Sequence, residues 1–175
     1  YGSITDPVRH GSSSPYPYNA KPAGGGLILM TVTGALTNNG VISADGASAV
    51  CCTGDAGGGG AGGAINLTLG MLAGSGTISS DGGTSDSNAA GGGGGGRVAI
   101  RLTQGGVTFA SFGEENITAT GGPLGAGVAP GCCGEEPGAA GTVYLETQAQ
   151  GSGGGTVRID NNDLSTTANT HIRPF

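Results

Sequence analysis

Four cysteines carry the most reactive side chains of this chain, and they occur as two vicinal pairs, Cys51-Cys52 and Cys132-Cys133. An even number of cysteines is typical of secreted proteins, in which disulfides persist. Bonded Cα atoms lie about 4.4–6.8 Å apart, so an internal bond requires the two glycine-rich stretches that carry the pairs to fold toward each other. Bonds to a neighbouring subunit are the alternative. A metal site of four thiolates is less favoured because the usual C-x2-4-C spacing is absent.

Three aspartates, Asp45, Asp81 and Asp160, occupy one aligned position at the end of a short apolar segment. A ladder of carboxylates is a candidate calcium site, although Asp before Gly is also ordinary turn chemistry. The two histidines, His10 and His171, stand far from any Ser/Asp or Cys/Asp pattern that would suggest a catalytic triad. We therefore expect no catalysis, no cofactor and no dedicated metal site.

Two tripeptides match the acceptor pattern for N-glycosylation, and they begin at Asn66 and Asn116. The residue after each asparagine is apolar and is expected to point into a core. Alternation then places both asparagine side chains on the outside.

The elements that must position these residues are strands, because the chain repeats an alternating apolar pattern four times. Each repeat begins with Gly-Gly or Ala-Gly, and its alternating segments are 27–32, 64–69, 97–102 and 142–147. Every second residue of these segments is almost always apolar, so we expect one face of each strand to point into a core and the other to face solvent. A shorter segment recurs in step at 41–46, 77–82, 116–121 and 156–161.

A strand pair repeated about every 33 to 45 residues predicts stacked coils. We expect an all-β fold, a right-handed parallel β-helix of about four coils with glycine-rich loops and irregular tails. An antiparallel β-sandwich of the same strands is the alternative. Residues 1–24 form an expected extended arm, residues 25–162 the repeat body and residues 163–175 a tail.

Composition limits the classes of protein to which this chain can belong. Of 175 residues, 41 are glycine, which alone suggests disorder. A net charge of only −6 and apolar residues in register argue instead for an ordered chain with a thin core. The run Gly91–Gly96 predicts tight turning or close packing of extended segments without side chains. An acidic chain with six Lys and Arg is unsuited to nucleic acid, and no apolar stretch is long enough to span a membrane.

The two ends are candidates for contacts between subunits. The leader contains four prolines, which disfavour helix and central strand. We expect its Tyr1, Tyr16 and Tyr18, together with Phe175 in the tail, to act as an assembly arm that docks either on its own domain or on a neighbour. The chain begins at Tyr1 rather than Met, as expected of a processed, secreted protein.

The repeat body resembles glycine-rich modules of very large secreted bacterial surface proteins of the adhesin type. Their pattern, G-G-x-I-x-L-T followed by G-x-G-x-I-S and a polyglycine run into G-R-I-A-I and G-T-I-Y-L, is matched by segments 62–68, 74–79, 96–100 and 141–145. The resemblance implies an extracellular or cell-surface location and a structural or adhesive role, with no catalytic residues to carry over. Those modules sit in much longer chains, and this departure suggests non-covalent or disulfide polymerisation in place of tandem repetition.

We therefore expect a structural subunit of an extracellular filament or surface assembly, whose main partners are copies of itself. Unpaired edges at the two ends of a stack are templates for another chain, and joining them gives an open head-to-tail assembly. The alternative is a monomeric adhesin or glycan-binding module that meets surface glycans. Such a module needs an aromatic-lined groove, and this chain has no Trp and only four Tyr.

Overall fold

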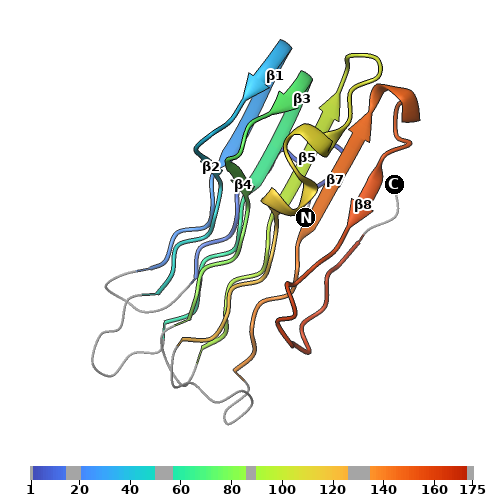
Figure 1. Ribbon diagram of the computed structural model, residues 1–175. Helices are drawn as coiled ribbons and strands as arrows, with labels where there is room; N and C mark the ends of the chain where they lie inside the picture. The colour runs from blue at the N-terminus through green and yellow to red at the C-terminus, as the bar shows by residue number, and fades with distance from the viewer. Residues whose placement is uncertain (1, 15–20, 50–56, 86–89, 126–134, 173–175) are drawn as a thin grey trace.

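A computed structural model describes residues 2–14, 21–49, 57–85, 90–125 and 135–172, and it contains two sheets joined by extended glycine-rich segments (Figure 1). From β1 to β7 the chain contributes strands to the two sheets alternately. The large sheet contains β1 (Leu27–Thr37), β3 (Ala64–Ala73), β5 (Arg97–Leu102), β7 (Thr142–Thr147) and β8 (Thr156–Arg158), in that order. The small sheet contains β2 (Val41–Ser43), β4 (Thr77–Ser79) and β6 (Ile117–Thr118). Three single 3-10 turns complete the structure: η1 (Phe109–Ser111), η2 (Glu114–Asn116) and η3 (Gln148–Gln150).

The strand register follows the repeat of the sequence. In the large sheet β1, β3, β5 and β7 run parallel, and Ile28, Ile65, Val98 and Val143 are successive partners. In the small sheet Ile42, Ile78 and Ile117 are successive partners. These alternating columns form the core between the sheets, because each strand points every second side chain inward.

The predicted fold class, a right-handed parallel β-helix of about four coils, is wrong. Residues 156–158 do not extend the small sheet beside β6 but form β8, which pairs antiparallel with β7 through Tyr144 and Val157. The molecule is therefore a mixed five-stranded sheet beside a three-stranded parallel sheet, neither a closed β-helix of four coils nor an antiparallel sandwich.

The connection between β7 and β8 explains this difference. Gly151 and Gly153 have φ angles of 76° and 77°, in the left-handed region that favours glycine, and they reverse the chain within a few residues. The carboxylate of Glu146 accepts the Gly153 N–H at 2.8 Å and fixes the reversed loop. Residues 38–40 and 74–76 carry the chain from the large sheet to the small one in the first two repeats, whereas residues 148–155 turn it back along β7.

Below the two sheets, glycine-rich backbone segments run side by side (Figure 1). The segments bond directly to one another: Gly83 N–H donates to Gly60 O at 2.8 Å, and Gly93 N–H donates to Gly83 O at 2.9 Å. In the same series Gly122 N–H donates to Gly93 O at 2.7 Å, and Gly138 N–H donates to Gly122 O at 2.9 Å. The hexaglycine run therefore packs as an extended segment without side chains, one of the two roles predicted for it. We call this region the glycine layer.

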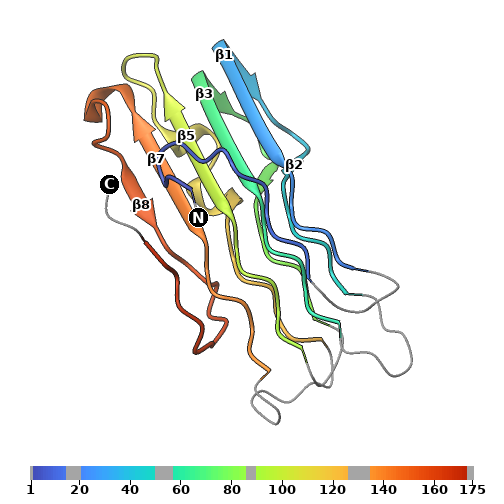
Figure 2. The ribbon, with the colours of Figure 1, turned by 180° about the vertical axis from the view of Figure 1, so that it is seen from behind.

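The chain ends lie on the body of their own molecule as far as they are described. Figure 2 shows the N-terminal segment crossing the face of the large sheet that points away from the small sheet. The tail runs along residues 136–140, where Thr166 Oγ1 donates to Pro137 O at 2.6 Å and Thr170 Oγ1 donates to Ala140 O at 2.7 Å.

Candidate functional site

Several of the predicted site residues lie outside the described residues. These are the cysteines Cys51, Cys52, Cys132 and Cys133, and the assembly-arm residues Tyr1, Tyr16, Tyr18 and Phe175. The disulfide pairing and the role of those aromatic side chains stay predictions. The remaining predicted residues are placed by the structure.

The aspartate ladder is a set of hydrogen bonds between successive repeats. Asp45 Oδ2 accepts from Ser79 Oγ at 2.9 Å, and its Oδ1 accepts from Asp81 N–H at 2.7 Å. Asp81 accepts in the same way from Thr118 Oγ1 at 2.9 Å and from Thr120 N–H at 2.6 Å. Each carboxylate thus joins its own repeat to the next, and the series ends where Thr120 replaces aspartate.

Asp160 does not join this ladder, because β8, which precedes it, belongs to the large sheet rather than the small one. Its Oδ1 accepts from Asn162 N–H at 2.8 Å, and the side chain is exposed. Among the described residues, no group of three His, Cys, Asp or Glu side chains gathers to hold a metal ion. The structure therefore brings Asp45 and Asp81 together but leaves Asp160 apart from them.

Both asparagines of the glycosylation sequons use their amide groups within the fold. Asn66 Nδ2 donates to Asp6 Oδ1 at 2.6 Å, and Asn66 Oδ1 accepts from Arg101 at 3.2 Å. Asn116 Nδ2 donates to Phe112 O at 2.7 Å. Both side chains are half-buried, so a glycan at either position requires these contacts to be absent.

The N-terminal arm docks on the outer face of β5 and β7. Ile4 is only 6% exposed and packs with Ala99 and Tyr144 in a small cluster separate from the main core. The Arg101 guanidinium donates to the Thr5 carbonyl and holds the arm in place. Sequence analysis did not identify Ile4 as the anchor of the arm.

A buried tyrosine stands beneath this arm. The Tyr144 hydroxyl donates to Glu146 Oε2 and accepts from Gly155 N–H at 3.1 Å. Burial and the hydrogen bond to Glu146 raise the pKa of the Tyr144 phenol above its ordinary value. This pair ties the start of β8 to β7, and its role is to hold the terminal hairpin.

The β1–β2 end of the stack is open. Among the described residues β1 pairs only with β3, and β2 only with β4. The inward side chains of β1 are half-buried where those of β3 are fully buried. Three large apolar residues are exposed here, namely Leu27 at 42%, Leu29 at 58% and Val41 at 72%. An unpaired strand of 11 residues with an apolar surface is a template for pairing with another chain.

The opposite end carries β8 in the large sheet and β6 in the small one. Val157 and Ile159 are 42% and 45% exposed. The free edge of β6 is held by side chains: Arg158 donates to Ile117 O and, at 3.0 Å, to Glu114 O. Asn161 Oδ1 accepts from Gly121 N–H at 2.7 Å.

Sequence analysis missed Arg158 and Asn161, although a signal was present. Arg158 stands in the column of Ser43, Ser79 and Thr118, and Asn161 replaces a glycine that the other three repeats share. Long polar side chains at such positions identify the repeat that closes the stack.

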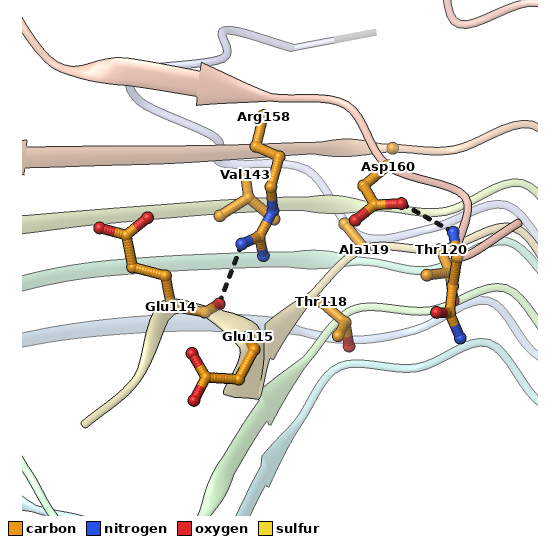
Figure 3. A pocket seen from close by; sticks show the side chains of 10 residues that line it. Glu114, Glu115, Thr118, Ala119, Thr120, Val143, Arg158 and Asp160 are labelled. Atoms are coloured by element: carbon orange, nitrogen blue, oxygen red, sulfur yellow. Dashed lines mark hydrogen bonds between the residues drawn. The ribbon is translucent and has the colours of Figure 1, made fainter. Parts of the chain in front are cut away.

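A cavity of about 490 Å³ lies beside β6 at this end (Figure 3). Thr118 and Thr120 form one side, Val143 of β7 contributes the apolar part, and Arg158 and Asp160 stand opposite. No aromatic side chain lines it, so stacking on a sugar ring is not available there.

Comparison with known proteins gives no relative: no family model, curated protein or solved structure matches this chain. In the part of the chain that the structure describes, no helix is long and apolar enough to cross a membrane. The resemblance to secreted surface modules stays a prediction.

Proposed function

We propose that this chain is a structural subunit of an extracellular filament or surface assembly that joins copies of itself head-to-tail through strand edges and tails. The observation that carries the proposal is the distribution of exposed apolar side chains. Among the described residues seven large apolar side chains are exposed, of which three lie at the β1–β2 end and two at the β8 end. These ends are opposite ends of one stack (Figure 1).

The energetic reason is that the core is incomplete at β1. Ile28, Met30 and Val32 pack against the buried core but keep part of their surface in water. Covering such surface contributes about 25 cal/mol per Å². A second copy that adds its terminal strand also supplies partners for the free backbone groups of β1, which no small ligand does.

The test is electron microscopy of the purified protein at neutral pH without reductant. Regular fibres a few nanometres wide support the proposal. Uniform single particles at high concentration contradict it and favour the monomeric adhesin or glycan-binding module, to be examined by glycan-binding screens.

A pair of variants on β1 tests whether the strand edge is the junction. Met30→Lys directs a charge toward the core side of the open end, and inward charges on edge strands oppose pairing. Thr31→Lys adds the same charge on the outer, exposed face of β1. We expect Met30→Lys to abolish fibres and Thr31→Lys to keep them, with circular dichroism confirming that both variants fold. Fibres of equal number from both variants would exclude β1 as the junction.

A further inference from the structure

The small sheet lacks a strand beneath β7. The large sheet has five strands and the small sheet three, so the last strand of the small sheet, β6, lies under β5, and no described strand pairs with its outer edge. The 490 Å³ cavity occupies this position (Figure 3). Thr118 of β6 and Ala119, the next residue, line one side of it, and Arg158 lines the other.

The edge of β6 carries backbone groups that a strand normally binds. In the earlier repeats Gly46 N–H donates to Asp81 O and Gly82 N–H to Thr120 O, both at 2.8 Å. The corresponding N–H of Gly121 has a side chain, Asn161, as its acceptor. The Ile117 carbonyl is bound by the Arg158 guanidinium. Side chains therefore stand in for a missing fourth strand.

The N-terminal arm carries the sequence of a small-sheet strand. Gly2-Ser3-Ile4-Thr5 follows the pattern of 40–43 and 76–79, in which glycine is followed by a variable residue, an inward isoleucine and a hydroxyl residue. The inward isoleucines of β4 and β6 are fully buried.

We propose that the free edge of β6 is a strand acceptor and that residues Gly2–Pro7 of a second copy bind there as the fourth strand of the small sheet. The inference rests on the proposed function, because head-to-tail assembly is what brings the second copy to this end. It identifies the junction as β-strand addition, with the cavity as the binding site.

Continuing the register of the small sheet fixes the contacts. Ile4 of the second copy lies beside Ile117 and faces the core. Ala119 N–H donates to the Thr5 carbonyl, as Ser80 N–H donates to Thr118 O at 3.0 Å within one chain. Thr5 N–H donates to the Ile117 carbonyl after Arg158 withdraws.

The next two arm residues suit the end of the added strand. Asp6 stands one position earlier than the aspartate of the repeats, in the inward column of Ala119. A carboxylate at this position requires a cationic partner, which the released Arg158 guanidinium supplies. Pro7 has no N–H to donate, so it ends the strand.

Distance permits the exchange. In a head-to-tail stack β1 of the second copy adjoins β8, about two strand spacings, or about 10 Å, from the vacant position. Gly11 and Ser12 bond to Gly25 and Ala61 of their own copy, so residues 8–10 form the free link between the arm and the body, and such a link spans about 10 Å. In the single chain the arm instead covers its own large sheet, where it uses the Thr5 carbonyl.

The two arm sites differ in one atom, which gives a direct test. Both sites bind the Thr5 carbonyl, through Ala119 N–H in the acceptor site and through Arg101 on the outer face, but only the acceptor site also uses the Thr5 N–H. A labelled peptide of residues 2–8 is added to the full-length chain, beside the same peptide N-methylated at Thr5. We expect binding to weaken at least tenfold on methylation, and we expect the unmethylated peptide to slow hydrogen exchange at Ala119 N–H. Equal binding of both peptides, or unchanged exchange at Ala119, overturns the proposal.

The second experiment places a photo-crosslinker at Ser3 of the full-length chain and mixes isotopically heavy and light copies before assembly. We expect crosslinks from the arm of one copy to residues 116–120 of another. Crosslinks confined to β5 and β7 of the same copy overturn the strand exchange while leaving filament formation intact. If no fibres form, the proposed function fails, and the peptide experiment alone decides the acceptor site.

Discussion

The glycine layer makes a sharp prediction about two neighbouring glycines of the hexaglycine run. A Cβ atom on Gly93 would lie 1.9 Å from Gly60 O and 3.0 Å from Gly83 N. A Cβ atom on Gly94 would meet no heavy atom closer than Ala139 O at 3.9 Å, which is an ordinary contact. Gly93→Ala and Gly94→Ala therefore add the same methyl group. At position 93 the methyl group clashes with backbone atoms, and at position 94 it meets no close neighbour.

The size of the effect follows from what must move at Gly93. The atoms in the way are backbone, so no side-chain rotation relieves the contact. Separation disrupts the bonds Gly83 N–H to Gly60 O and Gly93 N–H to Gly83 O. Each buried group left without a partner costs about 1–3 kcal/mol, whereas alanine in place of glycine restricts the unfolded chain and contributes about 0.4–1 kcal/mol to stability. We expect Gly93→Ala to lose roughly 2–5 kcal/mol and Gly94→Ala to be neutral or stabilising by up to about 1 kcal/mol.

The measurement is urea unfolding followed by far-UV circular dichroism, with thermal melts as a second readout. For a domain of this size 1 kcal/mol corresponds to about 2–4 °C in Tm, so the two variants should differ by roughly 5–20 °C. Hydrogen exchange should speed up at the amides of Gly83 and Gly122 in Gly93→Ala only. Stabilities that agree within about 0.5 kcal/mol would refute the close packing of the glycine layer.

Three further predictions concern side chains that join repeats. Asn38 is buried, and its side-chain amide donates to Thr77 O and accepts from Gly40 N–H, both at 3.0 Å. Asn38→Ala should therefore lower the free energy of unfolding by about 1–3 kcal/mol, measured with denaturant. An unchanged midpoint would show that the turn is stable without this side chain. Asp81→Ala removes the acceptor of two donors from the next repeat, so its free energy of unfolding should fall by a similar amount. Asp160 is exposed and accepts one local hydrogen bond, so Asp160→Ala should lose less than about 1 kcal/mol. A larger loss in Asp160→Ala than in Asp81→Ala would contradict the role of the aspartate ladder. The raised pKa of Tyr144 means that the folded chain holds the phenol proton more tightly than the unfolded chain, so this contribution is complete below about pH 10 and falls as pH rises through the folded-state pKa. Unfolding midpoints at several alkaline pH values should show this decline in the parent chain and a shallower one in Tyr144→Phe; equal slopes would exclude Tyr144 as the cause.

The sequence was sufficient to predict the strands and their register because each column is repeated. Ile28, Ile65, Val98 and Val143 stand at one position of four aligned segments, and parallel pairing of such segments is the simplest way to bury them together. The same reasoning placed Asp45 and Asp81 in one column, although their role in joining repeats depends on side-chain directions that the pattern does not contain.

The sequence was not sufficient for the last repeat, where local and repeated signals disagree. Residues 156–161 match the second-strand pattern, but the loop before them reverses at Gly151 and Gly153, both at positive φ, and forms a hairpin. The pattern gives no weight to that loop, whereas chain connectivity makes the antiparallel pairing with β7 the nearest one available. The docking of Ile4 on the outer face of the sheet was likewise hidden, since that face is expected to be wet.

The parallel register also determines how the chain folds. Partners in the large sheet, such as Ile65 and Val98 or Val98 and Val143, are separated by long stretches of sequence. The bonds of the glycine layer also join non-adjacent segments, at shorter separations such as Gly83 to Gly60 and Gly122 to Gly93. Loop closure must precede every such contact, so folding of this chain should be slow, in the range of milliseconds to seconds typical of non-local β topologies. Among the described strand pairs, β7–β8 is the one whose members are close in sequence. We expect it to form first, with the apolar columns adding strands onto β7 toward β1 and the glycine layer, which has no side chains to guide it, closing last.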